Sequence, residues 1–345
     1  MKPASLPLII LLFAVIPASR GKAADPGTTA PNAGSTNALP TGNVTVLGPV
    51  ACPAGAARGA SCTSIRVSCS GIPDLDATLG VALPAGVARG TVILLNSGTG
   101  TTFFNSGFPG PYLDDGFRVV QLAWASAWEG ANGAGLTASS CRPSTVFKYV
   151  FSAIHRGSRT TGFCGQGLSG GGGQLAYSLT QYGLADYFDY VLLAAGPGLS
   201  RMDYGCDPGL YTGPPRDLCP LLTDAPIAYG ADVQFKVNTW ENTTTCGSAN
   251  PPPSNIARWA ADSIVAGNVS FVYPHTAMSW FFCTTSPVNE SIGQGSFLID
   301  QVVPKNAPPD VNCYSGTCKG ENVWQDPDAV TAAESEMVAQ CVANH

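Results

Sequence analysis

The stretch TGFCGQGLSGGGGQLAY, residues Thr161–Tyr177, decides the fold because two patterns of different chemistry overlap in it. One is G-x-G-x-x-G, beginning at Gly165, which is typical of a dinucleotide-binding turn. The other is G-x-S-x-G, centred on Ser169, which is typical of the turn that presents a nucleophilic serine. The sequence on either side of the stretch has to decide between them.

The dinucleotide pattern is not supported by its surroundings. Such a turn normally follows the first strand of its fold, and an acidic residue roughly twenty positions later binds the ribose. Here two apolar segments typical of buried strands, Arg89–Leu95 and Phe117–Trp124, come before the turn. The next predicted strand, Tyr190–Ala195, leads into Gly-Pro and carries no acidic residue at its end. The sequence therefore predicts no nucleotide cofactor.

The surroundings favour the nucleophile pattern. A strand is predicted before Ser169 and a helix after it, and the flanking glycines allow the two to approach closely. The backbone N–H of Gly170 is then the expected first donor to an oxyanion. The glycine-rich loop after Arg89–Leu95 is expected to supply the second donor, from Gly98 or Thr99.

Strands and helices alternate along most of the chain, which predicts an α/β fold with a mostly parallel central sheet and helices on both faces. Short antiparallel strands are expected over residues 44–81, and a cap or loop insertion held by disulfides over 196–253. The remaining expected elements are helices at 143–155, 172–182, 255–265 and 326–342, and strands at 161–168, 277–283 and 297–303.

The N-terminal segment and the composition indicate an exported protein. Residues 1–24 have the pattern of a signal peptide, residues 25–43 form a low-complexity linker, and 44–345 are expected to be one domain. The twelve cysteines predict six disulfides in an oxidising, extracellular compartment. Four Asn-x-Ser/Thr sites make the chain a candidate glycoprotein; they begin at Asn43, Asn242, Asn268 and Asn289.

Charge and hydropathy exclude several classes of partner. A net charge of −6 with only 12% charged residues argues against nucleic acid. No segment after the signal peptide is apolar for long enough to predict a membrane span, and three histidines with no C-x-x-C pair predict no metal site. The oligomeric state is left open.

From Arg89 to Val342 the chain resembles the α/β-hydrolase superfamily, in particular its secreted esterase- and lipase-like serine hydrolases. The resemblance rests on the order of predicted elements and on the segments GQGLSGG and LLNSGTG. It implies cleavage of a small-molecule or polymeric ester through an acyl-enzyme on Ser169. It also implies an acid after the sixth or seventh strand and a histidine in the loop after the last strand.

That triad is incomplete in the sequence. If the last strand is 297–303, no histidine follows it between Pro304 and Gln325, and the resemblance puts the histidine position near Lys319. The acid is expected at Glu290, or at Asp203 after the preceding strand.

Three replacements for the base stay open. His275 would lie on the same edge of the sheet as Ser169 if a strand runs over Val269–Tyr273. Lys319 could serve if burial lowered its pKa. The third alternative is a catalytically impaired hydrolase fold that binds an extracellular ligand.

Overall fold

The computed structural model describes residues 38–104, 106–213, 218–219, 225–266, 270–285 and 290–344. The predicted signal peptide, most of the predicted linker and the sites at Asn268 and Asn289 lie outside these residues. The last residues of the predicted linker are packed onto the domain: Leu39 N donates to Gln181 O over 2.8 Å, and Gly42 N to Thr145 Oγ1 over 2.7 Å.

A nine-stranded sheet with the strand order β1-β2-β3-β5-β4-β6-β7-β9-β11 forms the centre of the fold. Strands β1, β2, β3 and β5 are antiparallel to one another in turn, and every pair from β5 to β11 is parallel. A separate pair, β8 and β10, is parallel. The strand bounds are β1 Asn43–Val50, β2 Ser61–Ser68, β3 Leu75–Ala82, β4 Gly90–Leu95, β5 Phe117–Trp124, β6 Gly162–Leu168, β7 Tyr190–Ala194, β8 Val272–Tyr273, β9 Ala277–Cys283, β10 Val303–Pro304 and β11 Asp310–Tyr314.

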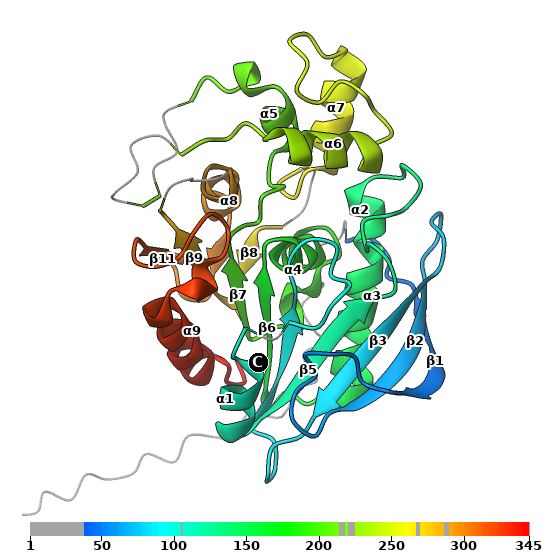
Figure 1. The fold of residues 1–345 in the computed structure, drawn as a ribbon, viewed down its shortest axis with the longest axis vertical. Coiled ribbons are helices and arrows are strands. Elements are labelled where there is room, and N and C mark those ends of the chain that lie inside the picture. Colours follow the sequence, from blue (N-terminus) through cyan, green and yellow to red (C-terminus); the bar gives the residue numbers. More distant parts are fainter. Residues whose placement is uncertain are drawn as a thin grey trace, which may run out of the picture. The chain divides into compact units, whose positions relative to one another are not determined.

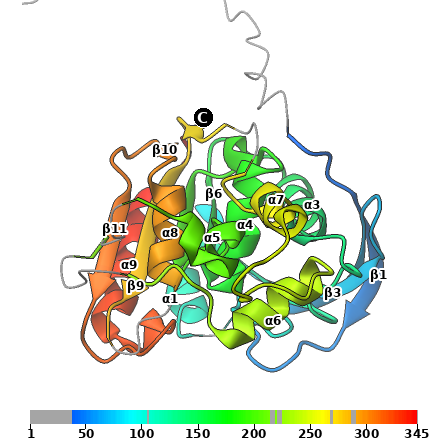
Figure 2. The ribbon, with the colours of Figure 1, turned by 90° about the horizontal axis from the view of Figure 1, so that it is seen from above.

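Helices cover both faces of the sheet, α3 and α4 on one and α1 and α9 on the other (Figures 1 and 2). The central strands are buried at every position, as a sheet covered on both faces requires. The helix bounds are α1 Pro109–Asp114, α2 Leu136–Ser139, α3 Cys141–Tyr149, α4 Gly170–Thr180, α5 Met202–Cys206, α6 Ala231–Trp240, α7 Pro253–Asp262, α8 Ser291–Ile299 and α9 Pro327–Gln340. This sheet order, with a strand–serine–helix turn at β6, is the α/β-hydrolase architecture that the sequence predicted.

One expected strand is wrong. Residues 297–303 were expected to form the last strand, but 291–299 form helix α8. Two glycines let this helix pack closely: a Cβ on Gly293 would lie 2.3 Å from Pro226 O, and one on Gly295 2.9 Å from the Phe282 ring. Tight packing through these glycines overrides the apolar run that resembles a strand. The last strand is β11, so the loop that follows it begins after Tyr314.

The insertion after β7 is longer than the sequence indicated. Helices α5, α6 and α7 lie together at the end of the sheet where the parallel strands finish, here called the carboxyl edge (Figure 1). Helix α7 was expected in the regular α/β pattern, but it packs on α5. Viewed from above, the three helices lie over the end of the sheet (Figure 2).

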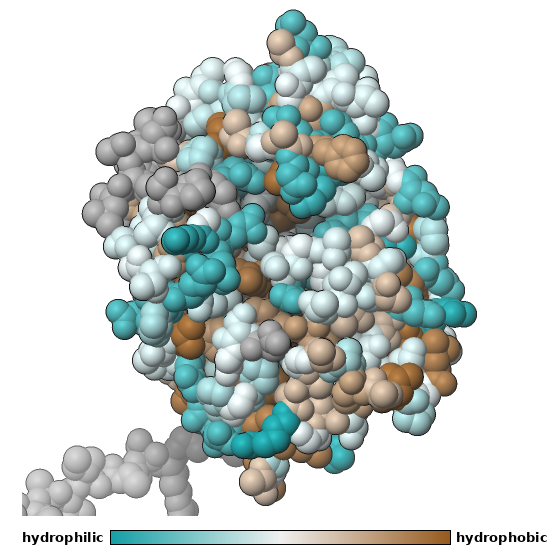
Figure 3. Space-filling view, in the orientation of Figure 1, coloured by the Kyte–Doolittle hydropathy of each residue, from teal (hydrophilic) through white to brown (hydrophobic). Residues whose placement is uncertain are grey.

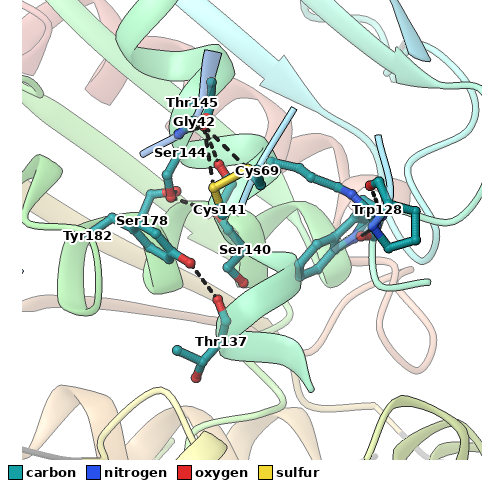
Figure 4. Close-up of a disulfide and its surroundings, with 12 residues drawn as sticks. Gly42, Cys69, Trp128, Thr137, Ser140, Cys141, Ser144, Thr145, Ser178 and Tyr182 are labelled. Carbon is teal, nitrogen blue, oxygen red and sulfur yellow. Dashed lines mark hydrogen bonds between the residues drawn. A yellow bond between two sulfur atoms is a disulfide. The ribbon is translucent and has the colours of Figure 1, made fainter. Parts of the chain in front are cut away.

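The predicted six disulfides are confirmed, since all twelve cysteines are paired. The pairs are Cys52–Cys62, Cys69–Cys141, Cys164–Cys341, Cys206–Cys246, Cys219–Cys313 and Cys283–Cys318. Figure 4 shows how the Cys69–Cys141 bridge joins the end of β2 to α3, beside the hydrogen bond from Gly42 to Thr145. The bridges therefore tie the antiparallel strands to α3, and the insertion and the C-terminal tail to the parallel sheet.

Candidate active site

Ser169 stands at the carboxyl edge between β6 and α4, and its backbone is strained. Its φ of 49° and ψ of −111° lie outside the regions that residues with a side chain usually adopt. Two hydrogen bonds hold it there: Ser169 N donates to Ala194 O over 2.8 Å, and Gly173 N donates to Ser169 O over 2.9 Å. Because the surrounding strand and helix impose this conformation, the side chain is presented on a sharp turn.

The glycines on either side of Ser169 leave no room for a side chain. A Cβ on Gly167 would lie 2.4 Å from the backbone of Gly171, and one on Gly171 would lie 2.4 Å from Leu95 O. These contacts bring β6, α4 and the end of β4 together around the serine. They are the close approaches that the G-x-S-x-G interpretation requires.

The loop after β4 lies directly against the start of α4. A Cβ on Gly170 would be 2.2 Å from Gly98 O, and Gly98 has a φ of 57° that favours glycine. As the first residue of α4, Gly170 has an N–H without an acceptor inside the helix. Among the described residues, no acceptor is found for the N–H groups of Gly98 and Thr99 either. The Gly98 nitrogen is 2.9 Å from the same Cβ position on Gly170, so backbone nitrogens of both loops lie next to the serine turn.

Trp128 holds this loop in place. Its backbone N donates to Thr99 O over 3.3 Å, and its indole Nε1 donates to Gly98 O over 3.4 Å. Trp128 O in turn accepts from the buried Arg142 over 2.7 Å. These bonds hold the loop in place against the start of α4.

Ser169 itself is partly exposed, and no described residue hydrogen-bonds its Oγ. The molecule is hollowed on the face shown in Figure 3, beneath the helices of the insertion. A ligand that approached from that side would meet the carboxyl edge first.

His275 is not where its proposed role requires it. His275 was expected at the carboxyl edge, where Ser169 stands, but it comes just before the start of β9. The first residue of β9 pairs with Tyr190 at the start of β7, so His275 lies at the opposite, amino edge. Its Nδ1 lies 3.0 Å from Asn344 O, in the C-terminal tail. Strand Val272–Tyr273 belongs to the separate two-stranded sheet, so it does not carry His275 to the carboxyl edge. The sheet lies between His275 and Ser169, and His275 is wrong as a base.

His155 also lies at the opposite, amino edge, as expected. Its Nδ1 is 3.0 Å from Thr91 Oγ1 at the start of β4, and its Nε2 is 3.0 Å from Ser158 O. Burial lowers its pKa. The third histidine, His345, lies outside the described residues.

Glu290 and Lys319 do lie in loops at the carboxyl edge. Glu290 follows β9 and directly precedes α8, and Lys319 follows β11. Burial raises the pKa of Glu290, and the carboxylate of Glu321 raises it further. Lys319 is exposed, so it lacks the burial that a lysine base needs. The Cys283–Cys318 disulfide joins the two loops.

Asp203 is committed to an ion pair. Its side chain is 5% exposed, and both carboxylate oxygens accept from Arg201, over 2.9 Å and 2.5 Å. The Arg201 guanidinium also stacks on Tyr204, 3.6 Å from the ring centre. This arrangement fixes the start of the insertion and leaves Asp203 unsuited to orient a base.

Two buried glutamates, one of them paired with a partly buried aspartate, were missed by the sequence analysis. Glu129, in the loop after β5, is 5% exposed; burial raises its pKa to about 7, and its Oε2 has no hydrogen-bond partner. Glu241 and Asp262 meet at the N-terminus of α2. The burial of these carboxyl groups could not be predicted from local sequence patterns, because it depends on segments that are far apart in the chain.

Among the described residues no group of three or more His, Cys, Asp or Glu side chains could hold a metal ion. None of their helices has both the length and the apolar character needed to cross a membrane. A surface pocket of about 290 Å³, lined by Arg58, Leu83 and Asp114 among others, lies at the amino edge and is separate from Ser169.

No protein-family model and no curated protein sequence matches the chain. Solved structures with a similar fold include an esterase from Pyrobaculum calidifontis, at 13% identity over 82% of this chain and 86% of that one, with a TM-score of 0.44. A bacterial heroin esterase is similar at 12% identity over 82% and 84%, with a TM-score of 0.49. Est1E from Butyrivibrio proteoclasticus is similar at 12% identity over 80% and 98%, with a TM-score of 0.46. Likeness at this level carries no information about substrate.

Proposed function

We propose that the chain is a serine hydrolase that cleaves carboxylic esters through an acyl-enzyme on Ser169. The observation that carries the proposal is the strained backbone of Ser169, held beside the backbone donors of Gly170 and of Gly98 or Thr99. Strain of this kind persists only where the surroundings impose it, and it is concentrated at sites of function. The paired cysteines support a second part of the proposal, that the enzyme works outside the cell.

In the proposed reaction Ser169 Oγ attacks the ester carbonyl carbon. The carbonyl oxygen becomes an oxyanion and accepts hydrogen bonds from Gly170 N–H and from Gly98 or Thr99 N–H. The positive end of α4 adds to this stabilisation. The alcohol then leaves, and water releases the acid from the serine.

We assign the general base to Glu290. Helix α8, which begins beside it, lies close to the serine turn: a Cβ on Gly295 would be 3.4 Å from Gly196 O, and one on Gly196 would be 3.7 Å from Ser169 O. A carboxylate is normally a weak base, but burial and the carboxylate of Glu321 raise the pKa of Glu290 above its ordinary value, which makes it a stronger base. In this mechanism Glu290 takes the proton of Ser169 and later returns it to the leaving alkoxide.

Labelling with a fluorophosphonate tests the nucleophile. The purified, disulfide-intact protein should form one adduct, mapped by mass spectrometry to Ser169, and Ser169→Ala should abolish both the adduct and the turnover of p-nitrophenyl esters. An unlabelled Ser169 in folded protein would refute the proposal.

Three substitutions then test the base. Glu290→Gln should lower kcat by about 10²-fold or more, the usual contribution of general base catalysis. His275→Ala at the amino edge and Lys319→Ala at the exposed loop are the matched controls and should leave kcat unchanged. Equal turnover in all three variants would refute the assignment of Glu290.

A second candidate function is favoured by one observation. Among the described residues no histidine lies at the carboxyl edge. A hydrolase fold that has lost catalysis and binds an extracellular ligand would account for that. The labelling experiment separates the two functions, because a binding protein without an activated serine would not react.

A further inference from the structure

Two acidic side chains meet at a single backbone N–H where the insertion touches the body of the domain. Leu136 N donates to Asp262 Oδ2, and Glu241 Oε1 lies 3.3 Å from the same nitrogen. Asp262 Oδ1 also accepts from Thr137 N over 3.0 Å. Glu241 is the residue after α6, and Asp262 is the last residue of α7. The pair therefore joins both helices to α2.

The two carboxyl groups are too close to be ionised together without a large cost. The Glu241 side chain is 1% exposed, and only a glycine leaves space between the groups: a Cβ on Gly135 would lie 2.3 Å from Asp262 Oδ2 and 3.2 Å from Glu241 Oε2. Two carboxyl groups in such a position, here the buried Glu241 and the partly buried Asp262, normally share one proton. Burial and the neighbouring Asp262 raise the pKa of Glu241 to about 8.

Few other charges face the pair. Arg258 of α7 donates from Nε to Glu241 Oε2 over 3.0 Å. From α4, Tyr177 donates its hydroxyl to Asp262 O over 2.7 Å, and the Tyr182 hydroxyl donates to Thr137 O over 2.7 Å. With the shared proton, one negative charge faces one arginine. Without it, two negative charges face that arginine.

Helix α6 depends on this contact more than α7 does. Only Val237 of its ten residues is buried, and Phe235 is 71% exposed. Its C-terminal end is held by Gly135 N, which donates to Trp240 O over 3.1 Å, and by the adjoining Glu241.

The end of α7 is anchored separately. Ile264 N donates to Leu199 O over 3.2 Å, and Gln181 Nε2 donates to Ile264 O over 3.2 Å. When the acidic pair loosens, α6 is thus the helix that can leave the body.

Helix α6 lies over the carboxyl edge near Ser169. Burial raises the pKa of both Glu129 and Glu290, and the cationic Lys236 of α6 opposes the rise in each. Glu129 follows β5 and Glu290 follows β9, on opposite sides of β6 in the sheet. Helix α6 is one of the helices grouped at the carboxyl edge, the edge at which Ser169 stands (Figures 1 and 2).

We propose that Glu241 and Asp262 form a proton-controlled latch that holds α6 over the site of Ser169 and releases it when their shared proton is lost. The part of the proposal that concerns access to Ser169 rests on the proposed function. The latch itself does not, because it concerns only the position of α6.

The direction of the pH effect follows from proton counting. With α6 closed, Glu241 keeps its proton up to about pH 8, and with α6 open its side chain is solvated and ionises near its ordinary pKa. The closed form binds one proton more, so it is favoured at low pH. Above about pH 8 the ratio of open to closed should rise up to tenfold for each pH unit.

Limited proteolysis measures the opening of α6. Trypsin can cut after Lys236 only when the helix is locally unfolded or detached. The cut after Arg156, in an exposed turn at the amino edge, is an internal reference for the pH dependence of trypsin. In the native protein the ratio of the two rates should rise by at least tenfold between pH 7.5 and pH 9.5.

Substitutions in the pair should remove this rise. Glu241→Gln keeps the shape of the side chain and donates an amide hydrogen where the shared proton was, so the ratio should stay at its low value. Asp262→Asn removes the other carboxylate but turns an amide NH2 toward one of the two backbone N–H groups that Asp262 accepts from, so the ratio should be raised at every pH and should no longer rise with pH. Glu334→Gln, in helix α9 away from the insertion, is the matched control and should behave like the native protein. A rise that persists in both latch variants, or no rise in the native protein, would overturn the latch.

A second measurement tests access to Ser169. The rate at which a bulky fluorophosphonate labels Ser169 is measured in the native protein and in Glu241→Gln at each pH. The ratio of the native rate to the variant rate should rise with pH, together with cleavage after Lys236. Cleavage that rises without faster labelling would overturn the role of α6 as a cover. Repeating the proteolysis with Ser169→Ala separates the hypotheses, because the latch should respond to pH even if Ser169 performs no chemistry.

Discussion

Replacing Ser169 with glycine should stabilise the protein while it removes the nucleophile. Because glycine is achiral, a pair of φ and ψ angles and its mirror image are equally favourable for it. The mirror image of φ 49° and ψ −111° lies in the extended region, so a glycine adopts the Ser169 backbone without strain. The strain relieved is about 1–3 kcal/mol. The greater freedom of glycine in the unfolded chain offsets about 0.5–1 kcal/mol of that gain. The net stabilisation relative to Ser169→Ala should be about 0.5–2 kcal/mol.

Thermal and urea unfolding of the two variants, with disulfides intact, measure this difference. Both lack the hydroxyl, so the comparison isolates the backbone. At about 2 °C per kcal/mol for a domain of this size, Ser169→Gly should melt roughly 1–4 °C above Ser169→Ala. The same pair of substitutions at Ser335, an exposed position in the ordinary helix α9, is the control, and there Ser335→Gly should be about 1 kcal/mol less stable than Ser335→Ala. Equal or lower stability of Ser169→Gly would refute the strained turn.

Three further outcomes are expected. Gly171→Ala places a Cβ 2.4 Å from Leu95 O, so it should shift the turn and lower kcat/KM by at least 10²-fold in ester assays, with little change if the turn is not the site. Glu129 has a pKa of about 7 in the folded protein against 4.5 ordinarily, so the folded state binds more protons and loses about 3 kcal/mol of stability as the pH rises through that range. Urea unfolding at pH 4 and pH 8 should measure the change in the free energy of unfolding that Glu129→Gln causes. The substitution should be more stabilising at pH 8 than at pH 4, and an equal change at both pH values would count against a buried carboxyl. Arg201→Met leaves the buried Asp203 without its cation and should cost about 3–5 kcal/mol in the same assay, whereas a loss below 1 kcal/mol would mean that the pair is solvated.

The nucleophile turn could be predicted because its determinants are local. Gly167, Ser169 and Gly171 lie within five residues, and the strand and helix on either side follow directly from residue periodicity. Strands β4, β5, β7 and β9 were predicted for a similar reason, since a short, mostly apolar run is typical of a strand buried on both faces.

Predictions that depended on long-range packing were the ones that failed. The segment 297–303 has an apolar run that suits a strand, yet Gly293 and Gly295 let helix α8 pack where larger residues would collide. The placement of His275 failed because Val272–Tyr273 pairs with β10 outside the main sheet. Pairing between strands is decided by partners that a local pattern does not contain.

The sequence by itself determined the α/β architecture, the serine turn with its glycines, and the capacity for six disulfides, because these depend on residue type and spacing over short stretches. Only the tertiary structure decided which titratable groups stand at the carboxyl edge, which are buried, and which meet one another. Glu129 acquires its raised pKa, and Glu241 meets Asp262, through contacts between segments up to 126 residues apart. Burial and proximity govern the charge of a side chain, and both arise only when the chain has folded.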